Sequence, residues 1–532
     1  MINENYQFGR YINAENDARW ADIQEMQSLS TLTKINIETQ DCSIGGIPLI
    51  SDGKIAYVDG SDTHTMIFGS TGSKKTRLFG MPLLNILAMA GESFIATDPK
   101  GELFEKTSGI IAEKGFKTIV LNFRDLNQSD FWNPLSIPYD LYHSGKRDEA
   151  VGLINDFVNA LAEPQRACSK EIYWVDMAVS QMLASLLFFI ETAKKDEANI
   201  FSFVNFFMQA CNSDKTQEIS DLCTEGSIAS VNFKSVLTNK AADKTYSSVT
   251  STAAAMLNMF TIRRALCQVL SKSSFTLNDL AYTKTAIYII VPDEKTTFHV
   301  IVTMFIKQVY EIMISEAHKN PQKRLPIRVN FVLDEFANIP KIPEMPSMIS
   351  AARSRNMRFF LYVQSMQQIV QKYDKEAHTI KGNCDNWVFL STREKELLDE
   401  ISYLCGSSSY INTFGTIERK PLISISELQR FNKNLGEALI LHGRNHPLVA
   451  ELPDIDDYDF KILPPYDTTK RTLPEIAMYN INKAIDAIKD SEIPLPFSVE
   501  VHGKEIFYKE KFNELKGLLG NSDDDDIDDW DY

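Results

Sequence analysis

The 532-residue chain lacks the features that mark a secreted, metal-binding or membrane-spanning protein. Its seven cysteines are scattered, and no CxxC or Cys/His ligand spacing occurs, which argues against a disulfide framework or a structural zinc site. The first twenty residues are polar and have no signal-peptide core. The longest apolar stretch, within residues 177–193, is too short to span a bilayer. We therefore expect a protein of a reducing cytosol without a transmembrane segment.

An excess of positive charge is also absent, since the formal net charge is −16. This excludes a basic protein that coats nucleic acid over its whole surface. A channel with a local positive lining remains compatible, because net charge describes only the average field. Apolar residues at 44% and charged residues at 24% are typical of a globular chain. Seven acidic residues lie in the last ten positions: Asp523, Asp524, Asp525, Asp526, Asp528, Asp529 and Asp531.

Strand-like apolar runs that alternate with helical patterns predict a parallel α/β architecture. Each run ends in a polar loop, first at IPLIS, HTMIF, SFIATD and TIVLNF, and later at residues 285–292, 328–336, 357–365, 386–392 and 437–442. Between the two sets, apolar residues recur every three or four positions and predict helices. These helices are expected at 149–162, 171–193, 198–211 and 252–270. Another helix is expected at 18–28, capped by Asn16 or Asp17.

The predicted organisation has five parts. They are a lead-in (1–45), the first part of a nucleotide-binding α/β domain (46–142), a helical region that includes an inserted all-helical domain (143–280), the second part of the α/β domain (281–465), and a C-terminal extension with the acidic tail (466–532).

Residues 69–76 have the pattern of a phosphate-binding loop, placed after a strand and before a helix as such a loop requires. They are Gly69, Ser70, Thr71, Gly72, Ser73, Lys74, Lys75 and Thr76. Backbone N–H groups would point at the phosphates, Lys75 would reach the β and γ oxygens, and Thr76 would ligate Mg²⁺. The general pattern has glycine where this chain has Lys74, whose side chain would either crowd the loop or add a second cation. The alternative is a Gly/Ser turn with incidental lysines.

A second candidate lies at the end of the strand in RVNFVLDEF, where Asp334 and Glu335 follow the apolar residues. In nucleotide hydrolases with a phosphate loop, the first acid holds Mg²⁺ and the adjacent glutamate polarises the attacking water. The alternative is a strand that ends in two solvated acids. The long separation from the phosphate loop requires an inserted domain, which the helical block supplies.

The ordered motifs of the chain resemble those of the type IV secretion coupling proteins, the conjugative TraG/TraD-class DNA-transfer ATPases related to FtsK and HerA. The similar segments are NDARWADIQEM, ATDPKGELFEKT, LNFRDLNQSDFWNPL, AIYIIVPDEKTTFHVIVTMFIKQVYE, VLDEFANIPKIPEMPSMISAARSRNMRFFLYVQSMQQI, CDNWVFLST and RKPLISISELQRF. The resemblance covers roughly residues 15–450, apart from a helical stretch near 195–250.

This resemblance implies a RecA-like P-loop NTPase motor domain with an all-helical inserted domain, assembled as a homo-hexamer. Such proteins hydrolyse ATP with Mg²⁺ and hand DNA–relaxase complexes or protein substrates to a secretion channel. By the same resemblance, Lys75 and Thr76 take the phosphate-loop roles. Asp334 and Glu335 take the Mg²⁺ and water roles.

Two further positions match functional residues of the family. Arg355 falls where an arginine finger reaches the neighbouring subunit, and Gln364 ends a strand where a side chain that senses the γ-phosphate is expected. The alternative for Arg355 is a surface arginine among Arg353 and Arg358.

The chain departs from the family in two respects. N-terminal transmembrane helices are usual there and are not found here, so either the chain is truncated or a separate membrane partner anchors it. The start at Met1 favours the partner. Lys74 puts the rate of hydrolysis in doubt more than nucleotide binding. Asp98 and Lys100 match a family segment near the nucleotide, without a definite role.

Other signals are weaker. His442 and His446 are separated by a glycine and followed by a proline, which argues against a helical metal pair. The acidic tail is predicted to be disordered, and it either docks on a basic relaxase or channel component, with Trp530 and Tyr532 as anchors, or solubilises the chain. Basic residues of the helical block line a DNA path or recognise cargo, or else form a solvated face. They are Lys234, Lys240, Lys244, Arg263 and Arg264.

Three functions remain open at this point. The first is a ring-forming ATPase that binds single- or double-stranded DNA without sequence specificity and couples recruitment of relaxase or protein cargo to export. It would act at the inner face of the bacterial membrane. The second is a nucleotide-binding receptor with little hydrolysis. The third is a related FtsK/HerA-like DNA translocase outside conjugation.

Overall fold

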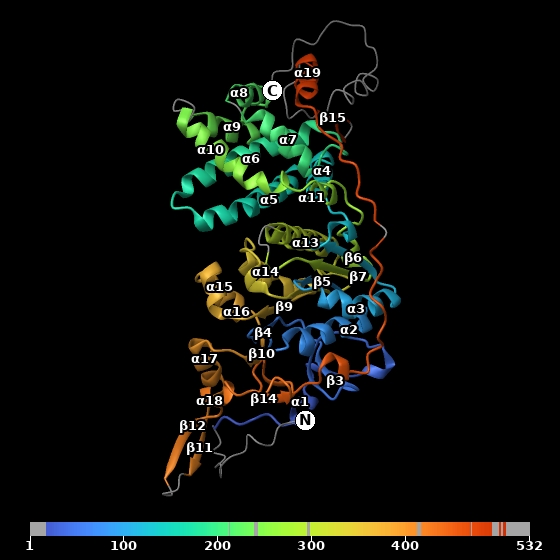
Figure 1. Ribbon diagram of the computed structural model, residues 1–532, viewed down its shortest axis with the longest axis vertical. Coiled ribbons are helices and arrows are strands. Elements are labelled where there is room, and N and C mark those ends of the chain that lie inside the picture. The colour runs from blue at the N-terminus through green and yellow to red at the C-terminus, as the bar shows by residue number, and fades with distance from the viewer. Residues whose placement is uncertain are drawn as a thin grey trace. The chain divides into compact units, whose positions relative to one another are not determined.

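The structure, a computed structural model, describes residues 17–211, 213–238, 243–294, 298–411, 416–469, 471–491, 499–501 and 504–506 (Figure 1). The chain divides into two units. The first comprises Met1–Asp130 and Ser274–Thr472, and the second Phe131–Ser273 and Leu473–Tyr532. The acidic tail, with Trp530 and Tyr532, lies outside the described residues, as does Lys240.

The first unit is built on a nine-stranded sheet. Its spatial order is β14 (Leu448–Glu451), β13 (Glu437–His442), β10 (Asn386–Ser391), β4 (Thr65–Gly69), β9 (Met357–Val363), β8 (Val329–Leu333), β5 (Ser93–Asp98), β7 (Thr285–Ile290) and β6 (Lys117–Asn122). The seven strands from β10 to β6 are parallel, whereas β13 and β14 add antiparallel strands at one edge. Strands β4, β5, β8 and β9 are buried along their whole length, which explains why they are continuous apolar runs. The predicted α/β class is confirmed.

Helices cover both faces of this sheet (Figure 1). Leu84 and Leu87 of α2 and Ile110 of α3 pack in one core with Phe94 and Tyr288 of the sheet. On the other side, α14 packs against β9. The helices of the first unit are α1 (Ile23–Ser28), α2 (Met81–Ala90), α3 (Glu102–Glu113), α12 (Asp279–Tyr282), α13 (His299–Lys319), α14 (Met345–Ala352), α15 (Met366–Tyr373), α16 (Glu376–Gly382), α17 (Lys395–Cys405) and α18 (Ile425–Leu428).

Helix α1 is shorter than predicted, and its N-cap is Asp22, not Asn16 or Asp17. The Asp22 carboxylate accepts from the amides of Gln24 and Glu25. Asp17 instead accepts a 2.8 Å hydrogen bond from the Ser409 amide, so a long-range contact replaces the expected local one.

Three small sheets contain the other strands of the described residues. They are β1 (Leu32–Asn36), β3 (Ile55–Asp59) and β2 (Ile47–Ser51); β11 (Ser407–Ile411) with β12 (Ile417–Pro421); and β15 (Val499–Val501) with β16 (Lys504–Ile506).

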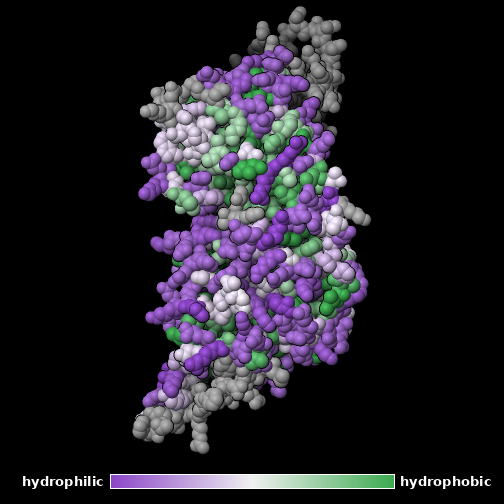
Figure 2. All heavy atoms as spheres, in the orientation of Figure 1, coloured by the Kyte–Doolittle hydropathy of each residue, from purple (hydrophilic) through white to green (hydrophobic). Residues whose placement is uncertain are grey.

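The second unit is helical, as expected for the inserted block. Its described helices are α4 (Ser136–His143), α5 (Arg147–Cys168), α6 (Ile172–Thr192), α7 (Ile200–Ala210), α8 (Ser213–Leu222), α9 (Ile228–Thr238), α10 (Asp243–Leu257), α11 (Arg264–Val269) and α19 (Ile481–Ser491). Phe189 of α6 and Phe206 of α7 pack against each other and against Tyr479. The segment that follows the first unit in sequence therefore contributes to the core of the helical unit. Figure 2 shows apolar side chains at the surface of the helical unit. The exposed large side chains of this unit include Ile172, Tyr173 and Val231.

The helix predicted at 252–270 is wrong as one element. Helix α10 ends at Leu257, a 3-10 turn spans Asn258–Phe260, and α11 begins at Arg264. The Thr261 hydroxyl donates to the Asn258 carbonyl, and such local side-chain bonds compete with helical ones. Among the described helices, α6 alone is long and apolar enough to cross a membrane by length and composition, and 61% of its apolar window is buried.

Residues 452–469, here called the C-terminal strap, follow β14 along the first unit. Tyr458 and Phe460 pack in a core with Ile37 and Val58. The carbonyl of Pro464 lies 2.0 Å from the position that a Cβ at Gly109 would take, so only glycine allows this approach to α3. The strap therefore packs closely on the sheet domain.

Candidate functional site

All the predicted site residues except Arg355 gather at the carboxyl ends of the parallel strands, where ligands bind in open α/β sheets. The phosphate loop follows β4, Asp334 follows β8, and Gln364 follows β9, which lies between them. Asp98 ends β5, on the other side of β8. Strand order thus brings together residues from four distant parts of the sequence.

The phosphate loop wraps around the side chain of Lys75. Its Nζ donates a 2.6 Å hydrogen bond to the Gly69 carbonyl and lies 4.0 Å from Oε1 of Glu335. A Cβ at Gly69 would stand 2.8 Å from Cγ of Lys75, so glycine is required for this fold-back. Burial lowers the pKa of Lys75, against the opposite effect of the acids at 334 and 335. The ammonium is therefore a buried charge that lies between the Gly69 carbonyl and the Glu335 carboxylate.

Lys74 occupies the place of the usual glycine and adopts a positive φ of 67°. Its Nζ donates to Oδ2 of Asp454 over 3.1 Å. The side chain therefore turns toward the C-terminal strap.

The loop and the acidic strand end are joined directly. The Thr76 hydroxyl donates a 3.0 Å hydrogen bond to Oδ2 of Asp334, and the Thr97 hydroxyl donates to the Asp334 carbonyl over 2.9 Å. Burial, followed by the charge of Glu335, raises the pKa of Asp334 to about 6. A hydroxyl beside a carboxylate suits Mg²⁺, which prefers oxygen ligands and is usually held by one or two carboxylates together with phosphates.

Gln364 bridges the acid pair to the loop. Its Nε2 donates to Oε2 of Glu335 over 2.6 Å, and its Oε1 accepts from the Thr71 hydroxyl over 2.9 Å. Glu335 has a positive φ of 51°, which directs the chain away from β8 directly after Asp334. The side chain expected to sense a phosphate therefore contacts both the candidate water-activating acid and the loop.

Asp98 and Lys100 lie on the neighbouring strand end. Burial raises the pKa of Asp98 to about 7, although its carboxylate accepts a 2.8 Å hydrogen bond from the Phe104 amide at the start of α3. The charge of Lys100 contributes to lowering the pKa of Lys75. Lys100 thus acts electrostatically on the site, and the charge of Asp334 contributes to the raised pKa of Asp98.

Two contacts of the loop were missed by the sequence reasoning. The Lys433 ammonium donates to the Gly72 carbonyl over 3.4 Å, and Asp454 binds Lys74. No local pattern marks either residue, because each meets the loop only through the fold of the chain.

Arg355 lies at the amino end of the parallel strands, opposite the phosphate loop, just before β9 begins. Because β9 alone spans about 20 Å, Arg355 is out of reach of the phosphate loop in the same chain. Its guanidinium donates to the Ala351 carbonyl over 3.4 Å, and Arg353 pairs with Asp385.

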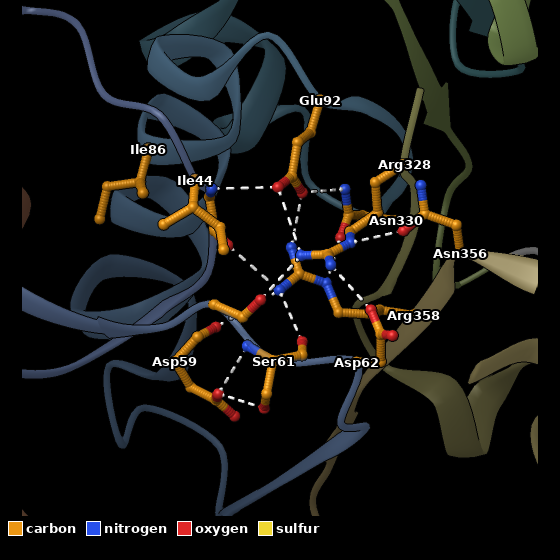
Figure 3. Close-up of polar contacts among 12 residues, drawn as sticks. Ile44, Asp59, Ser61, Asp62, Ile86, Glu92, Arg328, Asn330, Asn356 and Arg358 are labelled. Carbon is orange, nitrogen blue, oxygen red and sulfur yellow. Dashed lines mark hydrogen bonds and ion pairs between the residues drawn. The ribbon is translucent and has the colours of Figure 1, made fainter. Parts of the chain in front are cut away.

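Arg358, one of the two neighbours named in the surface-arginine alternative for Arg355, is itself buried (Figure 3). Its Nη2 donates to Glu92 over 2.6 Å and its Nε donates to Asn330 over 2.8 Å. Arg328 binds Asp62 over 2.7 Å beside it. Figure 3 shows Arg358 enclosed by these groups and by backbone carbonyls at the amino end of the sheet.

The remaining candidates do not join this site. His442 is buried, contacting Thr31 over 2.8 Å and Asn386 over 2.7 Å. No cluster of three or more His, Cys, Asp or Glu side chains that could hold a metal ion occurs in the described part of the chain. In the helical unit Lys234 pairs with Glu225.

Known proteins are similar to this chain in sequence and in fold. The family model for conjugative DNA transfer by the type IV secretory system matches residues 19–421. The VirD4 protein of Rhizobium radiobacter is 24% identical over 408 residues, or 74% of this chain and 55% of that protein. VirD4 of Agrobacterium fabrum is 25% identical over 415 residues, or 74% of this chain and 57% of that protein. The chain thus spans a little over half the length of these curated relatives.

Solved structures show the same fold. The bacterial conjugative coupling protein TrwBdeltaN70 superposes with a TM-score of 0.61 at 14% identity, covering 82% of this chain and 96% of that one. The plasmid coupling protein TrwB in complex with ADP and Mg²⁺ superposes with a TM-score of 0.56 at 14% identity, covering 88% and 98%.

The fold is that of a RecA-like P-loop domain with a helical domain, as predicted. The chain belongs to the family of type IV secretory system conjugative DNA transfer proteins.

Proposed function

We propose that the chain is the ATP-hydrolysing motor of a coupling protein that recruits DNA–relaxase complexes, or protein substrates, to a type IV secretion channel and drives their transfer. The observation that carries this proposal is the contact between Thr76 and Asp334, which joins the phosphate loop to the acidic strand end. ATP and Mg²⁺ are the proposed cofactors, in line with the TrwB structure that contains ADP and Mg²⁺.

The arrangement supports a division of labour among the chain's own residues. Backbone N–H groups of the loop and Lys75 would hold the phosphates, while Thr76 and Asp334 would ligate Mg²⁺. When bound, the cation neutralises charge that develops on the phosphoryl oxygens. Glu335, positioned by Gln364 over 2.6 Å, would orient and deprotonate the attacking water.

The proposed partners follow from the family. They are DNA bound without sequence specificity, a relaxase, components of the secretion channel, a separate membrane-anchoring protein, and further copies of the chain in a homo-hexamer. Arg355 would then act on the nucleotide of the neighbouring subunit, since it lies at the far edge of its own sheet. The proposed location is the inner face of the bacterial cell membrane.

The test is ATP turnover with single- and double-stranded DNA present. Lys75→Ala should reduce turnover about 100-fold or more, because it removes a charge that stabilises the transition state. Glu335→Gln should retain ATP binding and lose turnover. Lys34→Ala, which changes an exposed lysine on β1, is the matched control and should behave as wild type. Unchanged turnover in a folded Lys75→Ala protein would contradict the proposal.

The same measurements separate the other functions. ATP binding without DNA-stimulated turnover would favour a nucleotide-binding receptor. Turnover without capture of a relaxase or channel protein in pull-downs would favour an FtsK/HerA-like DNA translocase.

A further inference from the structure

The phosphate loop contains a residue whose backbone is in an unfavourable region. Lys74 has a φ of 67°, in the left-handed region that glycine adopts freely and residues with a Cβ adopt at a cost in free energy. The neighbouring Gly72 has a positive φ of 75°, so the loop contains two left-handed positions but only one glycine to fill them. Contacts of the folded protein must therefore offset the cost of this conformation of Lys74.

Asp454 of the C-terminal strap is the group in contact with the Lys74 side chain. Its Oδ2 accepts from Nζ of Lys74 and from Nε of Arg77, each over 3.1 Å, and its Oδ1 accepts from Nη2 of Arg77. The side chain of Asp454 is only 16% exposed, which shields these ion pairs from water. Burial alone would raise the pKa of Asp454, but the hydrogen bonds from Arg77 and Lys74 lower it, so the carboxylate stays ionised.

Asp456 provides an internal comparison, because it lies two residues further along the strap and binds Arg77 without touching Lys74. Its Oδ2 accepts from Nη2 of Arg77 over 2.5 Å, and Lys106 lies 3.8 Å from its Oδ1. Asp456 is 59% exposed, and pairs at such exposed positions contribute little. The two acids therefore share Arg77 and differ in the contact with Lys74.

We infer that Asp454 is a positioning residue for nucleotide binding: its carboxylate holds Lys74 in the left-handed conformation and so keeps the phosphate loop in the form that receives phosphates. This inference rests on the proposed nucleotide site. Asp454 does not itself reach the nucleotide, and it acts only through Lys74. The arrangement replaces the conformational freedom of the missing glycine with an ion pair to a segment 380 residues away.

Binding of a fluorescent ADP analogue with Mg²⁺, measured on the full chain, tests this role. Asp454→Asn should raise the Kd about tenfold, the factor that corresponds to 1.4 kcal/mol at 25 °C. Asp454→Glu should recover part of the loss, and Asp456→Asn should stay within about twofold of wild type because it leaves Lys74 paired. Melting temperatures of all variants identify any that fail to fold.

The decisive variant is Lys74→Gly combined with Asp454→Asn. Glycine adopts the left-handed conformation without help, so the double variant should bind with a Kd within about twofold of Lys74→Gly alone. A double variant as weak as Asp454→Asn would overturn the inference, because Asp454 would then act through Arg77. Tighter binding by Asp454→Asn would also overturn it, by showing that Asp454 withholds Lys74 from the phosphates.

The two proposals fail in different ways. A folded wild type that binds no nucleotide overturns both. The wild type could instead bind and hydrolyse ATP while Asp454→Asn has the same Kd as Asp456→Asn. That result overturns only the role of Asp454.

Discussion

The hydroxyl of Thr76 lies 3.0 Å from Oδ2 of Asp334, although 258 residues separate them in the sequence. The contact exists because β9 brings the ends of β4 and β8 to one edge of the sheet. It places two oxygen atoms that could ligate Mg²⁺ side by side, next to a loop that would bind phosphates.

Replacing Thr76 with alanine should weaken Mg²⁺ binding. The variant loses one of the two proposed ligands and the hydrogen bond to Oδ2 of Asp334. We expect the Mg²⁺ concentration for half-maximal ATP turnover to rise about tenfold or more. Thr76→Ser retains the hydroxyl and should stay near wild type. Equal Mg²⁺ dependence of the alanine and serine variants would contradict the assignment.

Replacing Gln364 with alanine should lower the rate of hydrolysis more than the affinity for ATP. The side chain holds Glu335 over 2.6 Å and Thr71 over 2.9 Å, so its loss leaves the acid without its positioning partner. We expect kcat to fall about 10- to 100-fold with little change in nucleotide Kd. Gln367→Ala, on the exposed side of α15, is the control. A purely binding defect would argue against this role.

Arg355 is expected to act on the nucleotide of a neighbouring subunit. Arg355→Ala and Glu335→Gln should each be inactive alone, but a 1:1 mixture should recover about a quarter of the sites, because some interfaces combine one intact arginine with one intact glutamate. The measurement is ATP turnover of the mixture. Arg353→Ala, which breaks a surface pair with Asp385, should remain active alone. Failure of every mixing ratio to restore turnover would contradict action in trans.

The buried Asp98 should make the stability of the nucleotide-free protein depend on pH. Its pKa is raised to about 7, so the folded state holds the proton more tightly than the unfolded state. The stabilisation is therefore present below about pH 4 and is lost as the pH rises through 7. Asp98→Asn should remove this pH dependence. The free energy of unfolding of the variant, relative to that of wild type, should therefore rise by roughly 2 kcal/mol between pH 5 and pH 8. Urea unfolding at both pH values measures the difference. Parallel curves for the two proteins would contradict the prediction.

Removing the buried charge of Arg358 should destabilise the first unit. Arg358→Ala leaves Glu92 buried without its 2.6 Å partner, and breaking such a pair costs about 3–5 kcal/mol. Thermal unfolding should show a markedly lower Tm. Arg324 is more exposed than Arg358 and pairs with Asp62, so Arg324→Ala should change the Tm little.

The phosphate loop and the acidic strand end could be predicted from sequence because each is a local pattern. A strand, a Gly-rich turn and a helix follow one another within residues 65–90, and Asp334 directly follows its own buried strand. Such patterns depend only on residues that are neighbours in sequence, so they can be recognised without knowledge of the fold. The same holds for the run of apolar residues that became β9.

Local patterns misled where a distant partner competes with a near one. Asp17 is of a residue type that often caps helices, but it binds Ser409, and Asp22 caps α1 instead. Arg358 lies five residues after the exposed Arg353, yet strand β9 turns it inward onto Glu92. The competing energies come from residues far along the chain, which no local window contains.

The sequence by itself determined the alternation of strands and helices, the loop that would hold phosphates and the acids that would face it, because these depend on local periodicity and residue type. Only the tertiary structure decided that Thr76 meets Asp334, that Gln364 reaches Glu335, and that Lys74 turns to Asp454. Those contacts arise from strand order and from the path of the C-terminal strap, which are set by packing across the whole sheet domain.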